Sequence, residues 1–200
     1  MPEPTIRLIR KDDIKTFVDL GLHGLLEFCN NDSLKHSTLN YHNQHRHKTE
    51  SFLAKIIDTN FHQFNKRAWV ATSGDNIVGT ILLQPRPRKP INDKSSVDIT
   101  NVYVDPEFRG TGIAQRLLET AENHCIEHNV TNVHLTTQNN LTRAIKFYEK
   151  EGYVATGRKD WQAYILIYYK KKLVQPVRTN KKRKVSTTRS NKKSRSVAVV

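Results

Sequence analysis

The sequence predicts one mixed α/β domain with a single βαβ crossover at its centre, followed by a basic tail. Segments of alternating polarity, typical of strands, occur between segments whose apolar residues recur at helical spacing. Between residues 97 and 137 a strand, a turn with two glycines, an amphipathic helix and another strand follow one another, which is the order of a βαβ unit. The periodic pattern stops at Leu173, so we expect a domain at 1–173 and a disordered tail at 174–200.

The first half of the domain is expected to form a strand, two helices and a β-hairpin. Apolar and basic residues alternate at the start of the chain, and the pair Asp12 and Asp13 can cap the helix that follows. The cluster at 73–76 is typical of a hairpin turn. The polar stretch 41–48 is interpreted as a solvated loop between the helices. The expected elements are a strand at 5–10, helices at 14–26 and 52–64, and hairpin strands at 68–72 and 77–84.

The second half is expected to form three strands and two helices in alternation. Prolines and polar residues at 85–96 indicate a loop before them. Gly152 stands where a helix commonly ends in a left-handed residue. The expected elements are a strand at 97–104, a helix at 112–129, a strand at 132–137, a helix at 141–152 and a strand at 163–169.

Charge divides the chain in the same way as periodicity. The formal net charge is +14 at pH 7, but residues 170–200 contain 12 Lys and Arg and no Asp or Glu, whereas residues 1–169 contain 21 basic and 19 acidic residues. The domain is therefore nearly neutral, and the basic excess lies in the tail. The segment Lys181–Val185, with its neighbour Asn180, resembles a nuclear import signal. We expect an import receptor or nucleic acid as partners of the tail, or a tail that is merely solvated.

Other features of the composition favour an intracellular protein. The two cysteines, Cys29 and Cys125, lie far apart and do not suggest a disulfide framework. Charged residues interrupt every apolar pair at the N-terminus, so no signal peptide is expected. An apolar run of 18 residues is absent from the sequence, and we expect no membrane partner.

The stretch VYVDPEFRGTGIAQRLL, residues 102–118, contains the glycine turn and could bind a phosphate. It is not a P-loop, because Ile113 rather than Lys follows Gly112. A dinucleotide fingerprint is disfavoured because Gln115 stands where a small residue is needed, and the next strand ends without an acidic residue. The N–H groups from Gly110 to Ala114 could instead converge on an anion at the start of a helix. Spacing alone leaves this interpretation and a turn without ligand both open.

Two motifs resemble those of the GNAT superfamily of N-acetyltransferases. The first is a strand ending in V-x-P, followed by R/Q-x-x-G-x-G/A at the start of a helix. The second is N-x-x-A-x-x-x-Y-E-K-x-G-F/Y, here with Leu141 at the position of its Asn, while Asn140 comes one residue earlier. The resemblance covers about residues 5–173. The matching residues are Val104, Asp105, Pro106, Arg109, Gly112 and Ala114 in the first motif and Ala144, Tyr148, Glu149, Lys150, Gly152 and Tyr153 in the second.

The resemblance implies a fold, a co-substrate and a reaction. It implies a central mixed, mostly antiparallel sheet of about six to seven strands with helices on both faces. It also implies that acetyl-CoA donates an acetyl group to a primary amine, which attacks directly in a ternary complex. The acceptor is a protein amine or a small amine. The cofactor-binding residues that it implies are Val102, Tyr103, Val104, Arg109, Gly110, Thr111, Gly112, Ile113, Ala114 and Asn140.

Two residues are candidates for proton transfer. An amine with a pKa near 10.4 must lose a proton before it attacks, and Asp98 in the strand that lines the implied slot is the candidate base. The alternative for Asp98 is an exposed carboxylate at a strand edge. Tyr148 matches the position of the family's general acid, and its alternative is a core aromatic beside Phe147.

Three histidines lie close together in the polar stretch 41–48. His42, His45 and His47 match no zinc spacing, so we expect no metal, although the first helical pair rims the acceptor site in the resembling family. These histidines are therefore candidates for contact with the acceptor.

The alternative function is a non-catalytic scaffold of the same fold whose basic tail docks nucleic acid or chromatin.

Overall fold

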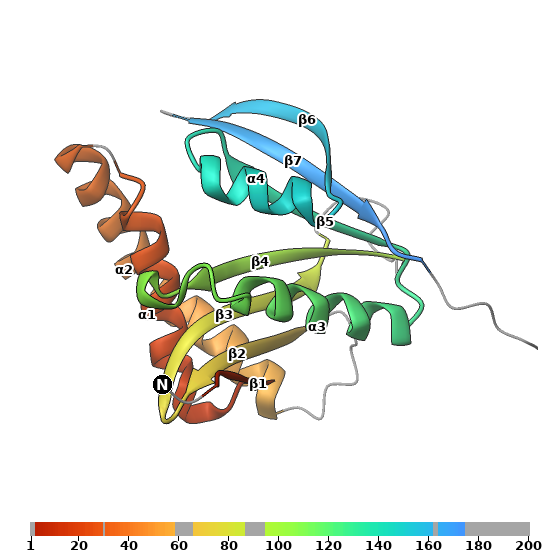
Figure 1. Ribbon diagram of the computed structural model, residues 1–200. Coiled ribbons are helices and arrows are strands. Elements are labelled where there is room, and N and C mark those ends of the chain that lie inside the picture. The colour runs from red at the N-terminus through yellow and green to blue at the C-terminus, as the bar shows by residue number, and fades with distance from the viewer. Residues whose placement is uncertain (1–2, 30, 59–65, 87–94, 162–163, 175–200) are drawn as a thin grey trace, which may run out of the picture.

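A computed structural model describes residues 3–29, 31–58, 66–86, 95–161 and 164–174 (Figure 1). These residues form seven strands, four α-helices and two short 3₁₀ turns. The strands are β1 (Thr5–Leu8), β2 (Arg67–Ser73), β3 (Asn76–Pro85), β4 (Ser96–Val104), β5 (Asn132–Gln138), β6 (Val154–Trp161) and β7 (Tyr164–Lys172). The helices are α1 (Ile14–Leu26), α2 (Asp32–Asp58), α3 (Ile113–Glu127) and α4 (Thr142–Lys150), with 3₁₀ turns at Lys11–Asp13 and Pro106–Phe108.

The seven strands form one sheet in the order β1-β2-β3-β4-β5-β7-β6. The pair β4 and β5 is parallel and the other pairs are antiparallel, with α3 as the crossover between the two parallel strands. The predicted mixed, mostly antiparallel sheet with a central βαβ unit is confirmed.

Helices cover both faces of the sheet, because alternate residues of its strands point to opposite sides. In β2, Trp69 and Ala71 pack in the cluster that contains the buried side of α3, whereas Ala68 and Val70 pack with residues of α1 and α2. Figure 1 shows α3 on the opposite side of β2 and β3 from α1 and α2. The continuous apolar run in β2 thus supplies two cores.

The helix α2 corrects the sequence analysis. The expected loop at 41–48 is wrong, because one helix runs from Asp32 to Asp58, whereas the expected helix at 52–64 is confirmed as far as Asp58. This stretch lacks Gly and Pro, and the side chain of Asn31 accepts a hydrogen bond from the backbone N–H of Leu34 at 2.8 Å, which caps the helix start. Few of its side chains are buried, so the apolar pattern was too weak to reveal the helix. The rest of the expected helix, with Phe61 and Phe64, lies outside the described residues.

The strand β6 is not predicted by the sequence analysis. All eight of its residues are exposed, and it pairs with β7 at the edge of the sheet. A strand whose two faces both meet solvent shows no alternation of polarity, so the pattern that reveals other strands is missing.

A buried carboxylate joins α3 to the last strands. Glu122 of α3 accepts hydrogen bonds from the Tyr153 hydroxyl at 2.8 Å and from Lys171 Nζ of β7 at 2.6 Å. A buried carboxylate with a charged partner and a second donor is well compensated. This contact fixes the crossover helix against the C-terminal part of the sheet.

Parts of two predicted segments lie outside the described residues. The tail at 174–200 lies outside the described residues from 175 onward, as do residues 87–94 of the expected loop before β4. Among the described helices, none combines the length and apolar character needed to cross a membrane.

Candidate functional site

The parallel strands β4 and β5 lie together at one end and apart at the other (Figure 1). Among the described residues their ladder has three pairs, which end with Asp98 opposite His134. Beyond this point a cavity of about 890 Å³ lies between them, lined by residues 99–104 of β4 and 136–138 of β5. The helices α1 to α4 supply the other walls. Such a separation leaves backbone groups of β4 available to a ligand.

A β-bulge bends β4 at the cavity. Thr100 pairs with Leu82 of β3 and Tyr103 pairs with Thr80, so two residues of β4 stand opposite one of β3. Asn101 in the bulge has φ of 52°, and its carbonyl accepts a hydrogen bond from the Thr80 hydroxyl at 2.8 Å. The Thr100 hydroxyl is buried in the cavity wall and has no hydrogen-bond partner among the described residues. A ligand that donates or accepts at this hydroxyl would satisfy it.

The glycine turn lies at the start of α3 and opens onto the cavity. Gly110 and Gly112 have φ of 84° and 86°, a conformation that strains other residues, and Gly112, the N-cap residue of the helix that follows, has no side chain with which to cap it. The first N–H groups of α3 therefore lack intrahelical acceptors and carry the positive end of the helix dipole. Gly110, Gly112, Ile113 and Ala114 line the cavity, whereas the Thr111 hydroxyl donates to the Phe108 carbonyl at 2.6 Å. This geometry suits an anionic group.

Arg109 ties the glycine turn to α1. Its guanidinium Nη2 lies 2.8 Å from both carboxylate oxygens of Glu27, and its Nε donates to the carbonyl of Val104 at 2.8 Å. The side chain therefore links the turn to the helix on the opposite wall and to the end of β4. The Tyr103 ring lies beneath it, 5.6 Å from the guanidinium carbon.

The helix α1 approaches β4 closely because it has a glycine at the contact. A Cβ atom on Gly24 would lie 2.7 Å from the Tyr103 ring. A larger residue would push α1 away from β4. The close approach keeps the α1 wall against residues 102–104, which the sequence predicts to bind the cofactor and which line the cavity.

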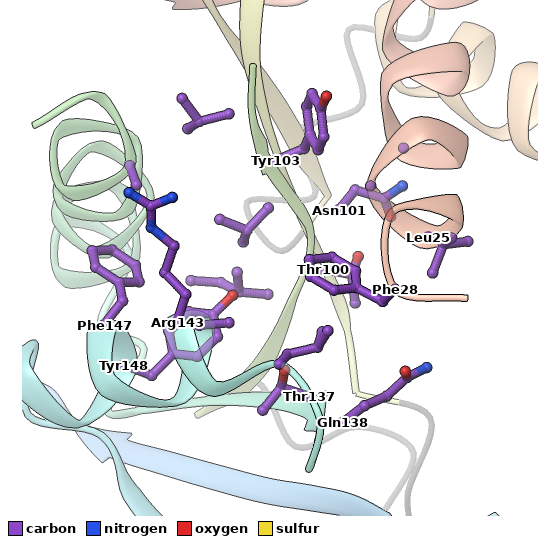
Figure 2. Close-up of a pocket in the computed structure, with 18 of the residues that line it drawn as sticks. Leu25, Phe28, Thr100, Asn101, Tyr103, Thr137, Gln138, Arg143, Phe147 and Tyr148 are labelled. Carbon is purple, nitrogen blue, oxygen red and sulfur yellow. The ribbon is translucent and has the colours of Figure 1, made fainter. Parts of the chain in front are cut away.

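Tyr148 lies on the cavity side of α4 and is buried. Its ring packs against those of Phe147, Tyr153 and Tyr169. Burial raises the pKa of the Tyr148 hydroxyl, which therefore stays protonated at neutral pH. Figure 2 shows this hydroxyl pointing into the space between α4 and β4.

Three predicted site residues, Thr111, Asp98 and Asn140, lie outside the cavity lining. Asp98 is in the closed part of the β4–β5 ladder, and its carboxylate lies 3.9 Å from Nε of Arg86. Asn140 is next to the lining residue Leu141, and its side-chain amide donates to the Phe28 carbonyl at 3.4 Å. The structure therefore brings Tyr148 and the glycines of the turn to one cavity, and it does not bring the side chains of Thr111, Asp98 and Asn140 into the lining.

The α2 wall contributes histidines that the sequence analysis named only as acceptor contacts. His42 and His45 line the cavity, while His47 does not. The His42 Nε2 atom is buried without a hydrogen-bond partner among the described residues. Burial lowers the His42 pKa, as does the charge of Arg46, while Asp19 and Glu50 act in the opposite sense. Arg46 is itself paired with both carboxylates. His42 is therefore a neutral imidazole with an unused nitrogen.

Comparisons with known proteins agree with this fold. A family model described as "Acetyltransferase (GNAT) family" matches residues 31–153. The chain is 30% identical to the rat protein N-acetyltransferase 8B over 90 residues, which is 45% of this chain and 40% of the rat protein. It therefore spans less than half the length of this curated relative.

Two solved structures share the architecture across most of the chain. The PaiA N-acetyltransferase of Thermoplasma acidophilum, in complex with coenzyme A, aligns with a TM-score of 0.67 at 15% identity, covering 86% of this chain and 99% of that one. A GNAT-family acetyltransferase of Streptococcus pneumoniae aligns with a TM-score of 0.65 at 20% identity, covering 86% and 100%. At these identities the likeness establishes a common fold.

Proposed function

The chain belongs to the GNAT family of acetyltransferases, and we propose that it transfers an acetyl group from acetyl-CoA to a primary amine by direct attack in a ternary complex. The observation that carries the proposal is the cavity between the separated ends of β4 and β5, with the uncapped start of α3 at its rim. The relatives named N-acetyltransferase and the neighbour bound to coenzyme A support the same chemistry.

The glycine turn and β4 would hold the donor. The N–H groups after Gly112 suit the pyrophosphate of acetyl-CoA, because they combine unpaired donors with the helix dipole. Val102, Tyr103 and Val104 line the cavity next to this turn, and an extended strand backbone suits the extended pantetheine arm. A backbone N–H of β4 near the thioester would also stabilise the oxyanion that forms when the amine attacks.

Tyr148 would assist the leaving group. Its pKa is raised by burial, so the hydroxyl is protonated throughout the neutral range. A thiol has a pKa near 8.5. The hydroxyl therefore acts as a hydrogen-bond donor to the sulfur as negative charge develops, and it keeps its proton while the thiolate leaves.

The base that deprotonates the amine has two candidates. Asp98 is the candidate from the sequence, and it would act through water, because its side chain is not in the cavity lining. His42 is the candidate from the structure, since it lines the cavity and has a buried nitrogen with no partner among the described residues. We favour His42, because its lowered pKa keeps it neutral and able to accept a proton at pH 7.

The decisive experiment measures donor binding and acetyl transfer separately. Calorimetry with acetyl-CoA tests the donor site, and a screen of small amines, peptides and histones tests the acceptor, with free thiol release and the mass of the product as readouts. We expect micromolar donor binding and thiol release that depends on an amine. Absence of donor binding would instead favour the non-catalytic scaffold.

The tail gives a separate proposal about location. We propose that Lys181–Val185 directs the protein to the nucleus, on the strength of its basic sequence. Residues 174–200 fused to a fluorescent reporter should accumulate in nuclei, and a fusion with Lys181, Lys182 and Lys184 changed to Ala should not. A reporter that stays evenly distributed would refute the proposal. An acceptor screen with protein ending at Leu173 tests whether the tail also selects the acceptor.

A further inference from the structure

Three potential metal ligands lie together at the C-terminal end of α3, away from the proposed donor site. The ligand atoms of His124, Glu127 and His128 all lie within 4.8 Å of one another. Residues at spacing i, i+3 and i+4 share one face of a helix, so the arrangement follows directly from the sequence H-C-I-E-H. Two imidazoles and a carboxylate are ligands that Zn²⁺ binds in proteins.

The His128 imidazole is already oriented for coordination. Nδ1 of His128 lies 2.8 Å from the backbone carbonyl of His124. A carbonyl oxygen only accepts, so Nδ1 carries the proton and Nε2 is the nitrogen with the lone pair. Histidines that bind metals commonly donate their other N–H to such an oxygen, which fixes the tautomer and the ring orientation.

The second imidazole is held in place by packing. The His124 ring lies edge-on to the buried indole of Trp69, with 5.4 Å between the ring centres. It also lies 4.3 Å from the His128 ring. The two rings are therefore held side by side before any ligand binds, which lowers the ordering cost of binding.

The C-terminal end of α3 favours a cation. The last carbonyl groups of a helix carry the negative end of its dipole. Tetrahedral bonds of about 2.0–2.1 Å from Zn²⁺ place its ligand atoms roughly 3.3 Å apart. The ligand atoms of the three side chains lie within 4.8 Å of one another, so a small movement brings them to this distance. Glu127 is exposed, and its side chain can rotate toward the two imidazoles.

We propose that His124, Glu127 and His128 bind a divalent transition metal ion, Zn²⁺ in the first place, with water as the fourth ligand. The 15 residues of α3 separate this site from the glycine turn by about 22 Å. The metal therefore stabilises the end of the crossover helix and does not enter acetyl transfer. Among the described residues this is the one group of three such side chains, and His42, His45 and His47 do not form another.

The test uses the full chain after treatment with a chelator, and it measures Zn²⁺ binding by calorimetry and thermal unfolding. We expect one strong equivalent of Zn²⁺ and an increase of several degrees in the unfolding midpoint. His124→Ala and His128→Ala should each lower the affinity at least tenfold and abolish the stabilisation. The matched control is His36→Ala, which changes an exposed histidine of α2 and should leave both effects intact.

A spectroscopic readout keeps the test independent of stability. Co²⁺ in place of Zn²⁺ should give the strong visible absorption of tetrahedral coordination in the unsubstituted chain and in His36→Ala, but not in His128→Ala. Equal Zn²⁺ affinity in the unsubstituted protein and in both site variants would overturn the proposal, as would absence of strong binding.

Discussion

The cavity has two walls that differ in how they are built. The wall that we propose to bind the donor, named the donor wall, consists of the glycine turn, the start of α3 and Tyr148 of α4, and its features are backbone N–H groups and one buried hydroxyl. The wall that we propose to bind the acceptor, named the acceptor wall, consists of α1 and α2, and its features are side chains, with His42 and His45 beside Arg46. Backbone geometry depends on a few glycines, whereas side-chain chemistry changes with every substitution. The donor wall therefore suits a ligand common to a whole family, and the acceptor wall suits the substrate of one member.

The strongest test of the donor wall is Tyr148→Phe. We expect kcat to fall about 100-fold, because the leaving thiolate loses its hydrogen-bond donor. The loss should be equal from pH 6 to 9, since burial raises the Tyr148 pKa and the hydroxyl does not ionise in this range. Tyr169→Phe is the matched control, because Tyr169 is buried, bonds to Glu149 and does not line the cavity. Full activity of Tyr148→Phe across this range would remove the residue from the mechanism.

The acceptor wall is tested by His42→Gln. We expect kcat/KM to fall about tenfold or more with saturating acetyl-CoA, because the amine loses its base. His47→Gln changes a histidine of the same helix outside the cavity and should have no effect. If Asp98 is the base instead, Asp98→Asn will lower the rate at neutral pH and recover at high pH, where the amine is already deprotonated. Rate profiles of the three variants over pH 6 to 10 separate these outcomes.

The same histidine should also affect stability in acid. The His42 pKa is lowered in the folded protein, so the unfolded chain binds a proton more readily below pH 6.5. Protonation therefore favours unfolding as the pH falls from about 6.5 through the lowered pKa. His42→Gln should lose less stability than the unsubstituted protein between pH 7 and 5 in urea unfolding. An identical dependence in both would show that the imidazole is not protected in solution.

Gly112→Ala separates the donor cradle from general backbone strain. Its φ of 86° should cost about 1–2 kcal/mol in an alanine, and the altered turn should also weaken acetyl-CoA binding. Gly74→Ala in the hairpin is the matched control, because its φ is 58° and a Cβ atom there also meets open space. Both variants should be less stable in urea, and only Gly112→Ala should bind the donor less tightly in calorimetry. Equal donor affinity in the two would argue against the cradle.

The smallest effect is expected where the two walls touch. Glu27→Gln removes the ion pair with Arg109, which is partly exposed, so the free energy of unfolding should fall by less than about 1 kcal/mol. Donor affinity should change less than threefold, since the backbone of the turn is unaltered. A large loss of donor affinity would show that the Arg109 pair is needed to hold the turn in place.

The donor wall could be predicted from the sequence because its requirements are local. A strand, glycines at two positive φ values and an uncapped helix start follow one another within 17 residues, from Val102 to Leu118. A second local motif predicts Tyr148, which lines the same cavity. Asp98 was inferred from its strand alone, and the strand does not reveal that its side chain lies at the closed end of the ladder.

The family resemblance indicates the histidines of the acceptor wall as acceptor contacts, but the sequence does not reveal the helix that carries them, because its apolar pattern is too weak. The stretch around His42 was interpreted as a loop, and only the packing of α2 against α1 turns that imidazole into the cavity and buries its nitrogen. The proposed metal site of His124, Glu127 and His128 shows the converse case. Its ligands are local in sequence, but the orientation of His124 depends on Trp69 from a distant strand.

The sequence by itself determined the order of most elements, the central crossover and the glycine turn, because periodicity and turn chemistry act over a few residues. Tertiary structure alone decided the separation of β4 from β5, the edge strand β6 and the burial of His42. Each of these depends on contacts between segments far apart in the chain, such as the three ladder pairs and the close approach of Gly24 to Tyr103. Local patterns carry no information about such contacts.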